Sequence, residues 1–228
     1  MFLTAILWTA LLAPAAAGPL ESRGEGMNAD WLISPHHGVG RLTFGLSPQA
    51  AASLAPLYGG PSPLMSQAHV AADVEAVIAG QGASMSQETI AAVRRAAQGL
   101  SNLSTQNLTK EGVPVLLEYR DGKLDGVTVE ARHGQAHYDG KPVFTLGARE
   151  VLALFERANG GPGRYRSSEA AFDNIAVSLY NFSTTSLQGE VRALSQADAD
   201  FRSRSVTLRR QPYWPADELD QFVTFSFN

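Results

Sequence analysis

The sequence predicts an α+β protein in which two tandem βαββ-like repeats form an antiparallel sheet with helices mostly on one face. Three observations support this prediction. The segment RLTFGLSPQAAASL, at residues 41–54, returns one hundred positions later as KPVFTLGAREVLAL. Gly-Gly-Pro follows both copies, at 59–61 and at 160–162. Two β-branched and aromatic runs flank Asp121-Gly122, a dipeptide typical of tight β-hairpins.

The first repeat is assigned to residues 27–130. Residues 41–46 alternate as a short strand. Ser47-Pro48 then combines an N-cap residue with proline at the first helical position. A short helix is expected over 50–57, and the Gly-Gly-Pro stop ends it.

An inserted helical hairpin is expected in the first repeat, at about residues 64–101. This segment is Ala-rich, and its larger apolar residues recur at helical spacing. Ser84 or Ser86 would cap the second helix of the hairpin. The run of Asn, Ser and Thr from Ser101 to Gly112 is expected to be a polar loop.

The second repeat is assigned to residues 131–228. Its helix is expected over 147–158, with Val151, Leu152, Leu154 and Phe155 available for burial. The apolar patterns place its strands at 136–139, 141–146, 172–182, 203–210 and 223–227.

Each repeat alone is too small to bury a core, because it has one apolar sheet face and one short helix. Two repeats that share a larger sheet solve this problem and form one compact unit. The residues that match between the copies are therefore expected in the core: Phe44, Leu46, Phe144 and Leu146. The sheet face opposite the helices would be free to bind something.

Composition excludes several classes of function. The chain has 228 residues, of which 44% are hydrophobic and 18% charged, and a formal net charge of -4. This mild acidity argues against a general nucleic-acid binder, which normally carries a basic patch. Cysteine is absent, which excludes disulfides, a thiol nucleophile and a cysteine-held metal.

Residues 1–26 allow two interpretations. The uncharged apolar run from Phe2 to Ala17 resembles a secretory signal peptide, and it is too short for a confident membrane span. Under this interpretation the protein is exported or periplasmic, with no stable membrane insertion once the leader is removed. Alternatively, translation starts at Met27 and the protein is cytoplasmic.

Two segments carry a family resemblance. GVGRLTFGLSPQAAASLAPLYGGP and the later LLEYRDGKLDGVTVEA resemble a pattern in small bacterial proteins of the toxin-immunity or inhibitor type. A similar tandem strand–helix–sheet plan occurs in the β-lactamase inhibitor proteins, and the SmpA-type assembly lipoproteins share the opening motif. The chain departs from these relatives at Ala50, where an acidic residue is usual and where the second copy has Glu150. It also lacks their cysteines. The resemblance implies a fold and a protein-binding role.

The histidines are the strongest candidates for enzymatic chemistry. His133 and His137 are four positions apart, which on one helix face would suit a metal. The surrounding residues favour a strand or loop instead, where positions four apart lie about 13 Å from each other. His36 and His37 are adjacent and would point in opposite directions. A His-dependent metal hydrolase therefore remains the least favoured alternative, and no catalytic, metal or cofactor residue is assigned.

The candidate partner-binding residues lie in two segments. RRQPYWP combines arginine and aromatic residues, the types enriched at interface hot spots. The helix expected over 147–158, in the second repeat, carries two more arginines. The candidates are Arg209, Arg210, Tyr213, Trp214, Arg149 and Arg157. We therefore expect a non-enzymatic module that binds another protein, such as an immunity or inhibitor protein for a bacterial toxin. The alternative is a structural factor of the periplasm or cell envelope.

Overall fold

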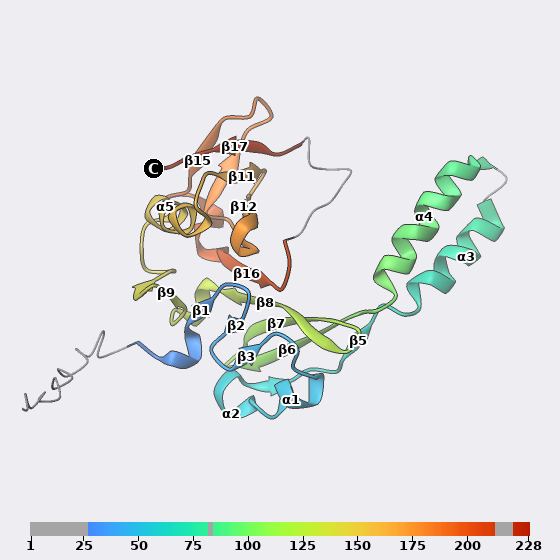
Figure 1. Ribbon diagram of the computed structural model, residues 1–228, viewed down its shortest axis with the longest axis horizontal. Coiled ribbons are helices and arrows are strands. Elements are labelled where there is room, and N and C mark those ends of the chain that lie inside the picture. The colour runs from blue at the N-terminus through green and yellow to red at the C-terminus, as the bar shows by residue number, and fades with distance from the viewer. Residues whose placement is uncertain (1–26, 82–83, 213–220) are drawn as a thin grey trace, which may run out of the picture.

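One large antiparallel sheet organises the molecule, as the sequence predicted (Figure 1). The computed structural model describes residues 27–81, 84–212 and 221–228. The leader interpretation of residues 1–26 lies outside these residues. The sheet has ten strands, nine of them in the order β17-β11-β12-β13-β16-β8-β7-β6-β4, with β5 also paired to β6. Their bounds are β4 (Gly60–Pro61), β5 (Met65–Ser66), β6 (Leu103–Lys110), β7 (Val113–Arg120), β8 (Lys123–Glu130), β11 (Gly163–Arg166), β12 (Glu169–Phe172), β13 (Val177–Tyr180), β16 (Ser205–Arg209) and β17 (Val223–Phe225).

The two halves of the chain meet at the centre of this sheet, where β8 pairs with β16. From this pair outward, the first half contributes β7, β6 and β4, and the second contributes β13, β12 and β11. The middle pair of the register is Thr128 opposite Thr207, whose hydroxyl oxygens lie 2.8 Å apart. In each half, therefore, strands that come earlier in the chain lie further from the central pair, from β8 out to β4 and from β16 out to β11.

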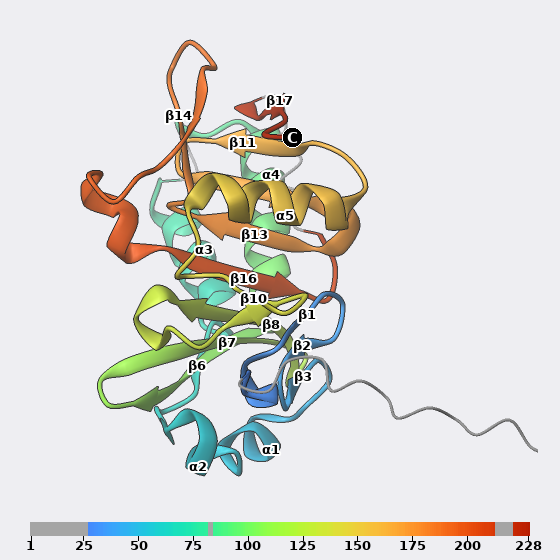
Figure 2. The ribbon, with the colours of Figure 1, turned by 90° about the vertical axis from the view of Figure 1, so that its left-hand side faces the viewer.

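Helices and small hairpins precede each set of strands. The first half has α1 (Pro48–Ala52) and α2 (Ala55–Tyr58), and the second has α5 (Ala148–Asn159). Figure 2 shows α5 and the small hairpins in front of the sheet. The short strands outside the main sheet are β1 (Ile33–Ser34), β2 (Gly38–Val39), β3 (Leu42–Thr43), β9 (His137–Tyr138), β10 (Lys141–Pro142), β14 (Ser183–Thr185) and β15 (Val191–Ala193). Single 3-10 turns occur at Ala29–Trp31, Ala131–His133, Asp173–Ile175 and Ala199–Ser203.

The inserted helical hairpin is confirmed as α3 (Val70–Gln81) and α4 (Gln87–Leu100). Ser86 caps α4 by accepting a hydrogen bond from the Thr89 amide. The two helices lie behind the sheet in Figure 2, on the side opposite α5. The hairpin therefore projects from the sheet instead of covering the core.

The core fills the space between the sheet and α5. On β7 the side chains of Val115, Leu117 and Tyr119 are fully buried, as the alternating pattern predicted. Of the four matched residues, Phe144 is buried, while Phe44, Leu46 and Leu146 are partly buried against the core cluster.

The predicted polar loop from Ser101 to Gly112 is wrong in its main part, because 103–110 form the eight-residue strand β6. One of its buried polar side chains is hydrogen-bonded inside the sheet. Gln106 donates to the Ser62 carbonyl and accepts from the buried Tyr119 hydroxyl. Backbone pairing with β7 along the whole strand therefore overrides the low intrinsic β-propensity of Ser, Asn and Gln.

Four other predicted elements are shorter or divided. The expected strand over 172–182 is interrupted by the Asp173–Ile175 turn, because Ala176 has a left-handed backbone with φ of 51°. The expected helix over 50–57 breaks into α1 and α2 at Ser53-Leu54. Residues 41–46 and 141–146 form only two-residue strands, and these belong to small hairpins outside the main sheet.

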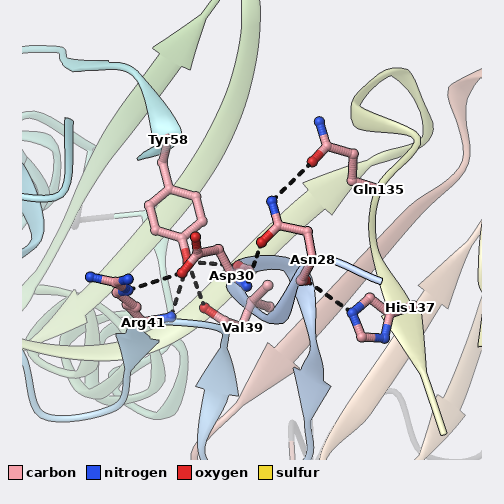
Figure 3. Close-up of polar contacts among 7 residues, drawn as sticks. All are labelled: Asn28, Asp30, Val39, Arg41, Tyr58, Gln135 and His137. Atoms are coloured by element: carbon pink, nitrogen blue, oxygen red, sulfur yellow. Dashed lines mark hydrogen bonds and ion pairs between the residues drawn. The ribbon is translucent and has the colours of Figure 1, made fainter. Parts of the chain in front are cut away.

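The first small hairpin is tied to the start of the described chain (Figure 3). The Tyr58 hydroxyl donates to the Asp30 carbonyl at 2.7 Å and accepts from the Arg41 amide at 3.0 Å. Arg41 also donates to the Asp30 carboxylate at 2.9 Å. Burial raises the pKa of Tyr58, which keeps this hydroxyl a donor at neutral pH. The turn at Gly40 fits directly beside these groups.

Gly40 and its equivalent in the second half, Gly140, provide a matched test of this contact. Both have positive φ, but a Cβ on Gly40 would lie 2.0 Å from the Asp30 carbonyl oxygen, whereas Gly140 has open space. Gly140→Ala should lower the free energy of unfolding by about 1 kcal/mol, the usual cost of alanine in this conformation. Gly40→Ala should cost about 3 kcal/mol, because the backbone must also move. Equal losses of unfolding free energy in urea denaturation would show that the Asp30 carbonyl does not restrict the side chain at position 40.

Candidate docking face

The face of the sheet opposite α5 has its own side chains, which alternate with those of the core. On β7, Leu116 and Glu118 point away from the buried set and are partly exposed. The same holds along the neighbouring strands β6, β8 and β16. We call this surface the open face, and define it by Leu103, Thr105, Asn107, Leu116, Glu118, Thr128, Glu130 and Ser205, all partly exposed.

A row of polar side chains crosses the sheet on this side. Arg166 lies 3.8 Å from the Glu169 carboxylate, which accepts from the Tyr180 hydroxyl at 3.2 Å. Arg209, on β16, lies 3.3 Å from Glu118 on β7. We call these five residues the polar ladder. It connects strands of both halves, so the two halves present one continuous polar surface.

Gly126 makes the central step of the ladder possible. It lies on β8, between Glu118 on one neighbouring strand and Arg209 on the other. A Cβ at this position would lie 2.4 Å from the Glu118 Oε2 atom. Because glycine leaves this space empty, the two charged side chains meet over the strand that separates them.

The electrostatics of the ladder favour charged arginine and neutral tyrosine. Burial by itself lowers the pKa of Arg209, but Glu118 and Tyr180 outweigh it, and the pKa of Arg209 is raised. The pKa of Tyr180 is also raised, first by burial and then by the Glu169 carboxylate. Both groups therefore keep their neutral-pH protonation state well into the alkaline range.

Two cavities adjoin the open face, one at each end of the β8–β16 pair. Each has a volume of about 480 Å³. The first is lined by Gln67, Leu103, Ser104, Thr105, Glu118, Tyr119, Arg120, Asp125, Arg209, Arg210, Gln211 and Pro212. The second is lined by Thr128, Glu130, Arg132, Ala199, Arg202, Ser203 and Ser205. Recesses of this kind can accept side chains of a docked partner.

The structure brings two of the predicted binding residues to this surface. Arg209 and Arg210 both line the first cavity. Tyr213 and Trp214 lie outside the described residues, so the prediction for RRQPYWP is left open beyond Pro212.

Arg149 and Arg157 lie on α5, on the other side of the sheet, and hold the C-terminal residues. Arg149 donates to the Phe227 carbonyl at 3.4 Å, and Arg157 donates to the Asn228 side chain at 3.2 Å. Glu156, on the same helix, is 1% exposed and accepts from the Phe227 amide. The charged side chains of this helix thus anchor the tail. These two arginines do not share a surface with Arg209.

The histidines that suggested a metal site bind separate backbone carbonyls. His133 Nε2 lies 3.1 Å from the Pro114 oxygen, and the centre of its ring lies 4.6 Å from that of Trp31, with the two rings tilted by 36°. His137 Nε2 lies 3.0 Å from the Asn28 oxygen (Figure 3). His36 contacts the Asn174 oxygen. Within residues 27–81, 84–212 and 221–228, no group of three or more His, Asp or Glu side chains is placed to hold a metal ion.

The sequence did not predict most of the open face or the polar ladder, including Glu118, Thr128, Glu169 and Tyr180. Their positions alternate with predicted core residues, which was the only available signal. Alternation predicts on which face of its strand a side chain lies, but it does not predict which strands become neighbours. The pairing of β8 with β16, far apart in the chain, brings these side chains together.

No protein-family model, curated protein or solved structure matches this chain. In the part of the chain that the structure describes, each helix is too short or too polar to cross a membrane.

Gly126→Ala tests whether the glycine allows Glu118 and Arg209 to pair. In the wild-type background, a double-mutant cycle of Glu118→Gln and Arg209→Gln should give a coupling free energy of about 1 kcal/mol. In the Gly126→Ala background it should fall to about zero, since the methyl group displaces the carboxylate. Gly161→Ala, where the added methyl group meets nothing within 4 Å, is the control and should leave the coupling intact. An undiminished coupling in the Gly126→Ala background would contradict the role assigned to the glycine.

Proposed function

We propose that this chain is a non-enzymatic protein-binding module that docks a partner protein on its open face, and that it acts as an immunity or inhibitor protein for a bacterial toxin. The observation that carries the proposal is the open face itself. It is a polar, partly exposed sheet surface with a cavity at each end of the β8–β16 pair.

The dimensions of the open face suit a protein partner. Its four strands span about 19 Å at the usual spacing. Three of them have eight residues and are about 26 Å long, and β16 has five and is about 17 Å long, so the face covers about 450 Å². A standard interface buries about 800 Å² on each partner. The hairpin of α3 and α4 projects on the same side and offers the remaining area, including the exposed Val77 and Val93.

The charge pattern of the open face favours binding of a specific partner over nonspecific binding of many proteins. Glu118 and Arg209 are held by each other, so their orientation is fixed before a partner arrives. A partner must match that fixed pattern, because an unmatched buried charge weakens the complex. The net charge of -4 would accelerate association with a basic partner through long-range attraction.

The resemblance of the two quoted segments to immunity and inhibitor proteins supports the same role. A structural factor of the cell envelope would also bind a protein, and it is the alternative that the sequence left open. The identity of the captured partner separates the two. A toxin supports the immunity role, whereas an envelope component supports the alternative.

Thr105→Arg tests whether the open face is the docking surface. Thr105 is partly exposed on β6 and lines the first cavity, so an arginine there would block a docked partner. In cross-linked affinity capture from the native source, wild type should retain a partner that Thr105→Arg loses by at least tenfold. Purified partner and chain should then show the same loss in a binding titration. If the partner is a toxin, co-expression with wild type should restore growth, and co-expression with Thr105→Arg should not.

The matched control is Thr145→Arg, which adds the same charge at an exposed site near the start of α5. It should bind as wild type does. Thermal unfolding of both variants should stay within about 0.5 kcal/mol of wild type, as is usual for surface changes. Equal binding by the two variants would place the interface elsewhere on the molecule.

A further inference from the structure

Arg204 is a buried cation that has no carboxylate partner in the described part of the chain. It is 4% exposed, and the described residues provide no acidic side chain within ion-pair distance of it. Burial lowers the pKa of Arg204, as expected for a guanidinium removed from water without a counter-ion. Buried charges in proteins are normally paired, because an isolated one carries a large desolvation cost.

Backbone carbonyls and aromatic rings hold Arg204 in a fixed position. It donates to the carbonyl oxygens of Phe201, Leu146 and Phe144, the last at 2.7 Å. Its guanidinium carbon lies 3.7 Å from the centre of the Phe201 ring. Since a guanidinium has five N–H groups, these bonds leave two for another acceptor.

A cavity of about 340 Å³ opens beside this group. It is lined by Ala131, Arg132, Phe144, Gln196, Phe201, Arg202 and Arg204, three arginines and no carboxylate. We call it the arginine cavity. Its volume lies in the range of small-ligand pockets.

The other two arginines differ in how they are engaged. Arg132 donates two hydrogen bonds to the Glu130 carboxylate, so its charge is balanced. Arg202 is exposed, and among the described residues it has neither a hydrogen bond nor an ion pair. The cavity therefore holds a net positive charge from Arg202 and Arg204. The amide of Gln196 adds a neutral polar group, and two phenyl rings form apolar walls.

We propose that the arginine cavity binds a small organic oxoanion, a carboxylate or phosphate group attached to an apolar body. The oxoanion would accept from Arg202 and from the remaining N–H groups of Arg204, since guanidinium matches both groups in a bidentate geometry. Phe144 and Phe201 would contact the apolar body. This small ligand is distinct from the open-face partner, although Arg202 also lines the second cavity of the open face.

Titrations with four probes test the chemistry of the site. Phenyl phosphate and benzoate supply the anion and the ring, inorganic phosphate supplies the anion alone, and benzyl alcohol supplies the ring alone. Backbone amide signals of residues 199–204 should shift and saturate with phenyl phosphate or benzoate, at about millimolar affinity or better. Stronger binding of one of these two identifies phosphate or carboxylate as the natural group. Inorganic phosphate should bind more weakly, and benzyl alcohol should not saturate the signals.

Arg202→Gln should weaken binding of the preferred probe at least tenfold, because one charge-assisted hydrogen bond contributes about that factor. Arg95→Gln is the matched control. It removes the same charge from an exposed arginine on α4 and should leave binding unchanged. Among the described residues the Arg202 side chain has no hydrogen bond or ion pair to lose, so neither variant should change the melting temperature without ligand. The preferred probe should raise that temperature in wild type and in Arg95→Gln, but not in Arg202→Gln.

Three results would overturn the proposal. The first is the absence of saturable shifts with both anionic ring probes. The second is an equal loss of affinity in Arg202→Gln and Arg95→Gln, which would indicate attraction to overall charge only. The third is unchanged affinity in Arg202→Gln, which would mean that Arg202 does not contact the bound anion.

Discussion

The antiparallel pairing of β8 with β16 is the constraint on which the rest of the structure depends. Five residue pairs join the two halves there, from Ser205 opposite Glu130 to Arg209 opposite Gly126. The inward side chains Val127, Val129, Val206 and Leu208 become buried through this pairing. Neither half has enough apolar surface to form a core without the other, since the short helices cover only part of each half-sheet. The two halves therefore share one sheet and one buried core.

The same pairing determines what lies on the two faces of the sheet. Alternation along each strand sends one set of side chains toward α5 and the other set to the open face. A larger side chain at position 126 of β8 would keep the Glu118 and Arg209 side chains apart on the open face. Because this residue is glycine, the charges of Glu118 and Arg209 meet across it. The polar ladder is thus a consequence of how the halves join, and it belongs to neither half alone.

Local signals predicted the elements that depend on local contacts. The Ser47-Pro48 helix start, the Asp121-Gly122 hairpin and the α3–α4 insertion are all specified by a few neighbouring residues. β6 was missed because its polar sequence is stabilised by pairing with β7 and by the contact of Gln106 with Tyr119, which no local pattern encodes. The burial of Glu156 has no local signal for a related reason. Its partners, including the amide of Phe227, come from the far end of the chain.

The two candidate sites differ in how their charges are balanced. On the open face, Glu118 and Arg209 neutralise each other within the chain, so a partner gains little from either charge and must instead fit the surface around them. In the arginine cavity, Arg204 is balanced only by carbonyl dipoles and aromatic rings, and Arg202 by solvent. Dipoles stabilise a cation less than a carboxylate does, so the cavity retains a field that attracts anions. A balanced broad surface suits recognition of a protein, whereas an unbalanced small cavity suits a compact anion. This difference is why we assign the two regions to different ligands.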